Sequence, residues 1–213
     1  MKIGILGSGD VARALAGGFL ERGDSVMLGT REPAKLADWE KAAGAAASTG
    51  SFADAAAFGE LVVVATNGAA TLAALAHAGP DNFAGKVVID VTNPLVMIEN
   101  APPGLFVSGK DSLGEWVQRA IPQARVVKAF NTVNFHDMVH PEYPDGPPDF
   151  FLCGDDQAAK AEVAEVARTF GWQNVTDLGP LEIARYLEPM VVIWVLYGIA
   201  TGKWRHACRM LVK

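Results

Sequence analysis

Cysteine is scarce in this sequence of 213 residues, and basic residues are outnumbered by acidic ones. The two cysteines, Cys153 and Cys208, are too few for a disulfide framework, and no CxxC pair or Cys/His pattern suggests a zinc site. The 24 acidic residues exceed the 18 basic ones, which gives a formal net charge of −6. Nucleic-acid binding relies on clustered Lys and Arg, so we expect neither a nucleic-acid partner nor a disulfide-stapled domain.

Long hydrophobic runs are also scarce. The N-terminal apolar run is interrupted at Gly7, which indicates a strand and not a signal peptide. Residues 190–200 (MVVIWVLYGIA) are strongly apolar but shorter than the roughly 20 residues that span a bilayer. We interpret them as a buried core or interface helix, and we expect a cytoplasmic protein without a membrane partner.

What the sequence does contain is a regular alternation of short apolar runs with segments of helical apolar spacing. We expect strands at residues 2–6, 25–28, 61–66, 86–91 and 125–129, and helices at residues 11–22, 33–43, 51–58, 69–78 and 112–120. Ser51 and Asp54 have the spacing of a helix capping box. This alternation predicts an α/β fold of the Rossmann type, a doubly wound parallel sheet with right-handed crossovers.

A turn-rich stretch at 140–148, with four prolines and a glycine, interrupts this pattern. Beyond it we expect strands at 150–153 and 174–178, a helix at 157–170 and a long apolar helix from about Leu181. The proline-rich stretch is therefore the predicted boundary between a Rossmann domain at 1–140 and a small C-terminal α+β extension at 149–213.

A glycine-rich turn follows the first strand. The segment Gly7-Ser8-Gly9-Asp10-Val11-Ala12 is a GxGxxA version of the dinucleotide-binding fingerprint. The first glycine permits the tight turn, the second lets the pyrophosphate approach the backbone, and Ala12 packs the helix onto the strand. The pyrophosphate is expected at the positive N-terminal end of the helix. Asp10 is an awkward neighbour for it unless its carboxylate points away.

The end of the second strand indicates which dinucleotide binds. NAD-specific domains place a carboxylate there for the ribose 2′-hydroxyl, but this sequence has Thr30 and Arg31, with Lys35 one turn into the next helix. A guanidinium matches the oxygens of a 2′-phosphate, and Thr30 and Lys35 add a hydroxyl donor and a charge. These residues predict NADP(H). The alternative is that Arg31 and Lys35 are surface charges paired with Glu32 or Asp38.

Polar residues follow three further strands at their carboxyl ends, where ligands bind in open α/β sheets. They are Thr66-Asn67, Asn93-Pro94 and Phe130-Asn131. Their side chains are candidates for binding the nicotinamide ribose or carboxamide. Turn and cap chemistry is an equally good interpretation of the first two pairs.

No metal site or catalytic residue is predicted. His136 and His140 are four residues apart, a spacing that can chelate a metal in a helix, but Pro141 follows and no third ligand is evident. A surface loop is the better interpretation. The sequence also has no evident Ser/His/Asp set or carboxylate pair.

Five short motifs along the chain carry a family resemblance. They are Gly7-Ser8-Gly9, Gly29-Thr30-Arg31, KAFNT at 128–132, CGDD at 153–156 and LGPL at 178–181. In combination they resemble NADP oxidoreductases that depend on a deazaflavin coenzyme, coenzyme F420. They also resemble the cytosolic oxidoreductase domain of six-transmembrane epithelial ferric reductases.

The resemblance implies hydride transfer between NADP(H) and a deazaflavin coenzyme, or a flavin such as FMN or FAD. The cofactors carry this chemistry and the protein orients them, so no catalytic side chain is required. We expect the acceptor between the nicotinamide and the C-terminal extension, with the turn Leu178-Gly179-Pro180 as one wall because glycine lets a flat ring approach the backbone. Between the acceptors, the CGDD and LGPL segments favour the deazaflavin.

Two alternatives stay open. One is an NADP-dependent dehydrogenase or reductase of another small substrate, although such enzymes carry a larger helical second domain than the C-terminal segment allows. The other is a non-catalytic NADP(H) sensor. The apolar helix at 190–200 is hydrophobic almost all round, which predicts burial on more than one side and hence a homodimer.

Overall fold

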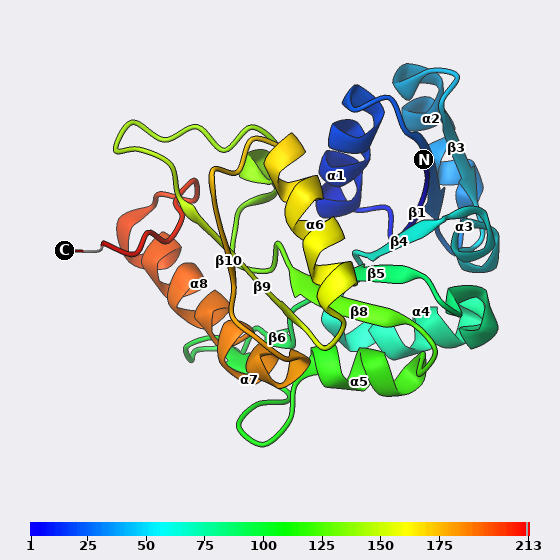
Figure 1. The fold of residues 1–213 in the computed structure, drawn as a ribbon. Helices are drawn as coiled ribbons and strands as arrows, with labels where there is room; N and C mark the ends of the chain where they lie inside the picture. Colours follow the sequence, from blue (N-terminus) through cyan, green and yellow to red (C-terminus); the bar gives the residue numbers. More distant parts are fainter. Residues whose placement is uncertain (212) are drawn as a thin grey trace.

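One mixed sheet runs through the molecule (Figure 1). The computed structural model describes residues 1–211 and 213. Among these residues the sheet has eight strands in the order β10-β9-β8-β5-β4-β1-β2-β3. They are β1 (Lys2–Leu6), β2 (Ser25–Gly29), β3 (Ala47–Gly50), β4 (Leu61–Val64), β5 (Val87–Asp90), β8 (Arg125–Ala129), β9 (Asp149–Gly154) and β10 (Asn174–Asp177). The order confirms the predicted Rossmann-type α/β fold.

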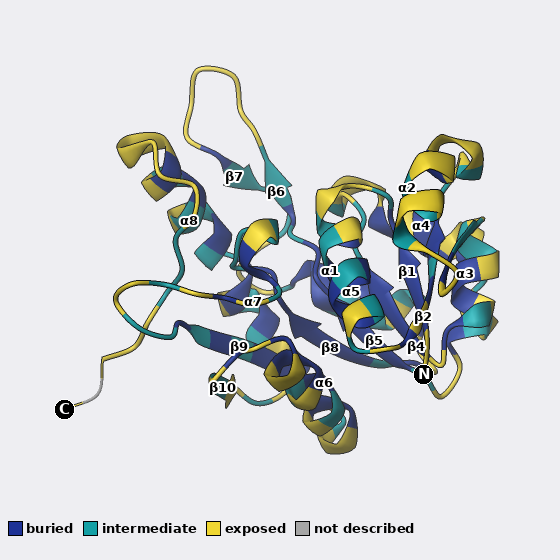
Figure 2. Cartoon of the chain, turned by 90° about the horizontal axis from the view of Figure 1, so that it is seen from above, coloured by how far each residue is buried: buried dark blue, intermediate teal, exposed yellow. Residues whose placement is uncertain are grey.

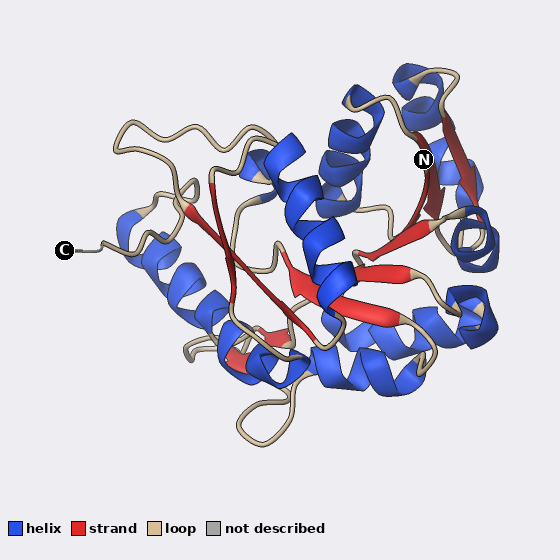
Figure 3. Cartoon of the chain, viewed as in Figure 1, coloured by secondary structure: helices blue, strands red, loops and turns tan. Residues whose placement is uncertain are grey.

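Helices cover both faces of this sheet (Figure 3). On one face α1 (Asp10–Glu21) and α6 (Gln157–Thr169) enclose one part of the core. On the other face lie α3 (Phe52–Phe58), α4 (Thr71–Ala78) and α5 (Leu113–Ala120). Ile5 and Leu6, adjacent on β1, belong to opposite clusters because successive strand residues face opposite sides. The remaining helices are α2 (Ala37–Ala43), α7 (Ala184–Leu187) and α8 (Met190–Thr201), with the 3₁₀ turns η1 (Pro33–Leu36), η2 (Gly68–Ala70), η3 (Pro80–Phe83), η4 (Phe135–Asp137) and η5 (Leu181–Ile183).

Local sequence signals account for several of these elements. The predicted capping box is present, because Ser51 Oγ accepts from Asp54 N at 3.1 Å and Asp54 Oδ2 accepts from Ser51 N at 2.9 Å. All four residues of β4 are buried, as its continuous apolar run predicted. The strand β3 and the small hairpin β6 (Leu95–Val96) and β7 (Gly104–Leu105) were not predicted. The sequence of β3, ASTG, lacks the apolar alternation that marks a strand.

The sheet is not wholly parallel, which corrects one detail of the prediction. After the proline-rich stretch the chain returns as β9, which pairs antiparallel with β8 in the register Val127↔Gly154 and Ala129↔Leu152. The edge strand β10 is parallel to β9. The two predicted units therefore share one sheet. They also share one core cluster, in which Phe130 packs against Phe150 with ring centroids 4.6 Å apart.

The C-terminal helical region begins at Leu181, as predicted. The turn η5 and helices α7 and α8 follow one another as a helical stretch, Leu181–Thr201, of 21 residues. By length and composition alone this stretch could cross a membrane, contrary to the estimate from residues 190–200. Charged residues in it bind the Rossmann part of the chain, namely Arg185 to Glu115 and Glu188 to Lys128. Beyond them, part of α8 is exposed (Figure 2), and Ile193 on this helix is 69% exposed.

The close packing of α3 onto β1 leads to a testable prediction about the stability of the folded protein. A Cβ on Gly4 would lie 2.0 Å from the Ala55 carbonyl oxygen, whereas a Cβ on Gly17 in α1 would meet no described atom within 4 Å. We expect Gly4→Ala to lower the free energy of unfolding by about 1–3 kcal/mol through overpacking. The matched Gly17→Ala should raise it by about 0.5–1 kcal/mol through helix propensity. Urea denaturation measures both, and a neutral Gly4→Ala would contradict the packing described.

Candidate functional site

The glycine turn between β1 and α1 has the geometry that its sequence predicts. Gly7 adopts φ +139°, and a Cβ on it would lie 2.4 Å from the Ala65 carbonyl oxygen. Only glycine fits this close crossing of β1 and β4. Ala12, in the first turn of α1, is fully buried. A Cβ on Gly9, in contrast, would meet no described atom within 4 Å, so the space beside it is open to a ligand.

A cavity of about 310 Å³ lies at the carboxyl edge of the central strands. It brings together seven of the predicted site residues, from the ends of β1, β2 and β4, namely Gly7, Ser8, Gly9, Thr30, Arg31, Thr66 and Asn67. The Thr30 hydroxyl lies 3.4 Å from that of Ser8, so the end of β2 meets the phosphate-binding turn. The N-terminus of α1 and the exposed guanidinium of Arg31 therefore border the same cavity.

The opposite wall of this cavity was missed from the sequence. It consists of Phe52 and one face of η2 and α4, formed by Ala70, Ala73, Ala74 and His77. These four have the spacing i, i+3, i+4, i+7 of a single helix face. The run of small residues at that spacing was the available signal, but only a helix at 69–78 was predicted there.

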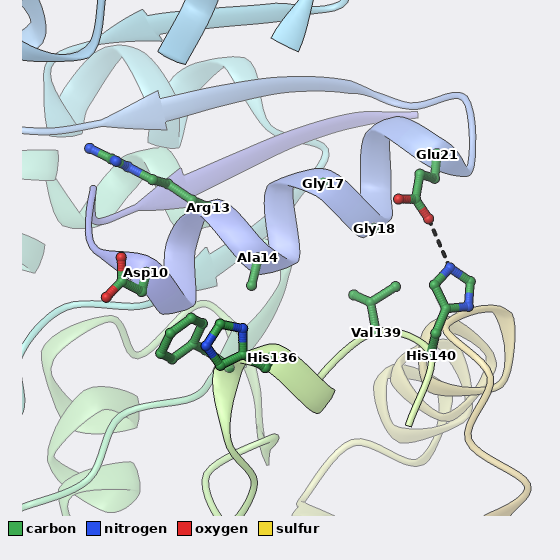
Figure 4. A pocket seen from close by; sticks show the side chains of 10 residues that line it. Asp10, Arg13, Ala14, Gly17, Gly18, Glu21, His136, Val139 and His140 are labelled. Carbon is green, nitrogen blue, oxygen red and sulfur yellow. Dashed lines mark hydrogen bonds and ion pairs between the residues drawn. The ribbon is translucent and has the colours of Figure 1, made fainter. Parts of the chain in front are cut away.

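Six predicted cofactor residues do not line this cavity, and the first three of them along the chain are Asp10, Val11 and Lys35. Asp10 lines a separate groove of about 420 Å³ on the side of α1 that faces His136 (Figure 4). Val11 is half-buried against the core. Lys35 forms an ion pair with Glu32 at 2.8 Å on the surface, and the hydrogen bond from Lys35 lowers the pKa of the Glu32 carboxyl. The position of Asp10 removes its carboxylate from the open cradle beside Gly9.

The two histidines considered as metal ligands also line the groove of Figure 4. His140 Nε2 pairs with Glu21 Oε2 at 2.9 Å, and the His136 ring lies against Phe135. In the part of the chain that the structure describes, no group of three or more His, Cys, Asp or Glu side chains could hold a metal ion.

Thr66 and Asn67 make the turn and cap contacts that one of the two interpretations expected. The Thr66 and Thr71 hydroxyls are 2.9 Å apart, and Asn67 Oδ1 accepts from Ala69 N at 3.1 Å. These contacts are helix-cap chemistry. Both residues also line the 310 Å³ cavity.

Asn93 and Asn131 are bound to each other across the ends of β5 and β8. Asn93 Nδ2 donates to the Asn131 carbonyl oxygen at 2.7 Å, and Asn131 Nδ2 donates to Asn93 Oδ1 at 3.1 Å. A second bond from Asn131 Nδ2 reaches the Leu187 carbonyl oxygen at 3.1 Å. Asn131 Oδ1 is buried and has no hydrogen-bond partner within the described residues. The neighbouring Phe130 has φ +59°, and its side chain lies in the core, 3% exposed.

Beneath these asparagines lies a buried charge cluster that the sequence did not reveal. Lys128 Nζ contacts Asp90 Oδ2 at 2.9 Å, Glu188 Oε1 at 2.8 Å and the Thr92 carbonyl oxygen at 2.6 Å. Burial alone would lower the pKa of Lys128, but the two carboxylates outweigh burial and raise it. The lysine therefore stays charged. Burial raises the pKa of nearby Cys153 to about 12, so this thiol is not a nucleophile near neutral pH.

The turn Leu178-Gly179-Pro180 is not where the sequence analysis placed it. Because β9 runs antiparallel to β8 and β10 is parallel to β9, the turn after β10 lies toward the amino edge of the parallel strands. There the Gly179 carbonyl oxygen accepts from Gly154 N at 3.0 Å. The expectation that this turn faces the nicotinamide end is therefore wrong. The C-terminal segment does reach the carboxyl edge at the α7–α8 junction, through Leu187 and Glu188.

Comparison with known proteins places this site in a family. Residues 2–94 match the model of "NADP oxidoreductase coenzyme F420-dependent" proteins. A protein from Arthrobacter sp. FB24, provisionally assigned as an F420-dependent NADP reductase, has a solved structure with TM-score 0.95 and 41% identity, and all of both chains is covered. The F420-dependent NADP reductase of Methanocaldococcus jannaschii is 29% identical over 92% of this chain and 91% of its own.

A metalloreductase is also among the similar proteins. Metalloreductase STEAP3 of Rattus norvegicus is 33% identical over 88% of this chain, which spans only 36% of that relative's length. Reductive aminases of Aspergillus terreus, near 21% identity and TM-score 0.66, share the fold. The fold, the glycine turn and the full-length likeness at 41% identity agree, and the chain belongs to the family of coenzyme F420-dependent NADP oxidoreductases.

Proposed function

We propose that this enzyme transfers a hydride between NADP(H) and a deazaflavin coenzyme, with a flavin as the second candidate acceptor. The observation that carries the proposal is the single cavity in which the open cradle beside Gly9 meets Thr30 and Arg31. The C-terminal helix reaches the same carboxyl edge at Leu187. A redox partner held there would lie against the nicotinamide.

The residues of the cavity fit NADP(H). The pyrophosphate would rest on the free N–H groups at the start of α1, where the helix dipole favours an anion. Arg31 and Thr30 would bind the 2′-phosphate, since no carboxylate stands at the end of β2 to select the 2′-hydroxyl. The face of α4 that carries Ala73 and Ala74 offers a flat apolar wall to the adenine.

The nicotinamide end would lie beside Asn93 and Asn131. Asn131 Oδ1 is an acceptor without a partner in the described chain, which suits an amide donor of the carboxamide. Bound NADPH supplies the hydride, and the residues of this edge orient the ring and exclude water. We assign no proton transfer to a side chain.

The deazaflavin is the preferred acceptor because the relatives that match this chain over nearly their whole length are named for it. Its wall would be the α7–α8 junction in place of the turn at Gly179. The test is NADPH oxidation measured with coenzyme F420, FMN, FAD and riboflavin. Turnover with the deazaflavin supports the proposal. Turnover with flavins alone would reverse the choice of acceptor, and NADPH binding without any turnover would favour another substrate or a sensor.

Cofactor choice is predicted to depend on Arg31. Losing a charge-assisted hydrogen bond costs on the order of 1.5–3 kcal/mol, so Arg31→Ala should weaken NADPH binding roughly 10-fold or more. NADH binding should change little. Lys35→Ala is the matched control, because Lys35 is already paired with Glu32 and lies outside the cavity. Titration calorimetry measures the affinity of each of the three proteins for both cofactors, and equal affinity of the unmodified protein for NADPH and NADH would contradict the assignment.

The pyrophosphate cradle is predicted to depend on Gly9. A valine there meets no described protein atom at its Cβ, so Gly9→Val should fold normally while its side chain occupies the place of the pyrophosphate. We expect dinucleotide binding to be lost and the thermal midpoint of the unliganded protein to be retained. Unaltered NADPH binding by the folded variant would show that the fingerprint is not the cofactor site.

We further propose a cytoplasmic homodimer that uses the outer face of α8. Ile193 and Tyr197, one turn apart on this helix, are 69% and 47% exposed, and residues 190–201 carry no charge. Apolar side chains gathered in this way are typical of an interface. Light scattering at micromolar concentration should give the dimer mass, and Ile193→Glu should give the monomer mass. A monomeric unmodified protein would overturn the proposal.

A further inference from the structure

We propose that Glu188 is a positioning residue, which fixes the start of α8 against the nicotinamide end of the cofactor site and so sets the distance to the acceptor. That this distance serves hydride transfer rests on the proposed function. Its basis is a closed ring of buried polar contacts that connects the C-terminal helix to the loops after β5 and β8.

The first half of the ring centres on the Glu188 carboxylate, which is 1% exposed. Its Oε1 lies 2.8 Å from Lys128 Nζ and accepts from Gly114 N at 2.8 Å, while Oε2 accepts from Leu113 N at 2.9 Å. These two N–H groups open α5, so the carboxylate caps that helix at its positive end. One side chain of the C-terminal segment thus binds both a helix N-terminus and a buried ammonium.

The second half of the ring runs through the loops at the carboxyl edge. Lys128 Nζ donates to the Thr92 carbonyl oxygen at 2.6 Å, and Thr92 is itself held by Asp90 Oδ1 through its backbone N–H and its hydroxyl. The next residue, Asn93, is bonded to Asn131. Asn131 donates to the carbonyl oxygen of Leu187, the chain neighbour of Glu188, and this contact closes the ring.

Stability alone is a poor explanation for this arrangement. Removing two carboxylates and an ammonium from water is costly, and buried ion pairs are often no more stabilising than apolar residues of the same shape. What the charges do provide is a single geometry, because Glu188 must reach Lys128 Nζ, Gly114 N and Leu113 N at the same time. The helices around the ring are tightly packed, because a Cβ added to Gly114 would lie 3.3 Å from Ala184 Cβ.

A fixed geometry matters at this edge because hydride transfer requires reacting atoms about 3–3.5 Å apart, and a misplacement of about 1 Å can slow a reaction about 100-fold. The ring holds the residues beside the nicotinamide and the first residues of α8 in one rigid unit. A shift of α8 would therefore change the rate of transfer without changing the adenine half of the site, which lies on β2 and α4.

The test compares Glu188→Gln with Glu182→Gln, which removes a charge from an exposed glutamate of η5. Glu188→Gln keeps the shape but removes the negative charge and replaces one acceptor oxygen with an NH2 donor, so it cannot accept from both backbone N–H groups and also pair with the ammonium. We expect it to bind NADPH within twofold of the unmodified affinity, and to transfer the hydride to the acceptor about 10-fold to 100-fold more slowly in single-turnover stopped flow. Glu182→Gln should match the unmodified enzyme in both.

A triple variant, Lys128→Met, Asp90→Asn and Glu188→Gln, separates positioning from folding. It removes all three charges together, so no buried charge is left unpaired, and it should fold with a thermal midpoint close to that of the unmodified protein. Slow transfer in this folded variant supports the proposal. Unmodified transfer rates in folded Glu188→Gln and in the triple variant would overturn it.

A second measurement does not depend on the acceptor. Hydrogen exchange of the α8 amides should slow when NADP⁺ binds to the unmodified protein, and NADP⁺ should have no such effect in Glu188→Gln, although it still binds. If NADP⁺ slows exchange equally in both proteins, the ring does not connect the two sites. If the unmodified enzyme reduces no acceptor but its α8 amides respond to NADP⁺, the proposed function fails and the positioning role stands.

Discussion

The charge of Lys128 is the constraint on which the carboxyl edge of this sheet depends. An ammonium with no exposure to water must find anionic or carbonyl partners for its protons. Its partners come from β5, from the loop after β5 and from the C-terminal helix, which are far apart in the sequence. The cluster can therefore form only when the chain after the proline-rich stretch has returned to the sheet. The pairing of β9 with β8 and the docking of Glu188 are therefore both needed to complete the cluster around Lys128.

Patterns that depend on neighbouring residues were predicted well from the sequence. The glycine turn, the capping box at Ser51 and Asp54 and the buried strand β4 are each determined within a few residues of chain. The meeting of Gly9 with Arg31 also followed, because the second strand of this fold always ends beside the first. In these places the local signal and the fold agree, which is typical of sequences that specify one structure.

Features that depend on strand direction and on partners distant in sequence were not predictable in the same way. The direction of β9 is set by its pairing with β8 across a long connection, and nothing in the residues of β9 itself reveals it. That single reversal moved the turn at Gly179 to the opposite edge. Lys128 sits in an otherwise apolar strand, and its burial depends on Glu188, 60 residues later in the numbering. Phe130 looked like a cleft residue because it follows a strand, but its left-handed backbone places the ring in the core.

The site accordingly has two halves with different physical origins. The half proposed to hold the phosphates and adenine is built from consecutive β–α units at the start of the chain, and the family model matches this region, residues 2–94. The half proposed to meet the acceptor is built from Asn93, Asn131 and the α7–α8 junction, which only tertiary contacts bring together. Small changes in the C-terminal segment can move α8 without disturbing the glycine turn or Arg31. The same cofactor half can then serve different acceptors, and relatives that share it are named both as a deazaflavin-dependent reductase and as a metalloreductase. The identity of the acceptor is therefore expected to reside in how the helix after Glu188 is held, and not in the dinucleotide fingerprint.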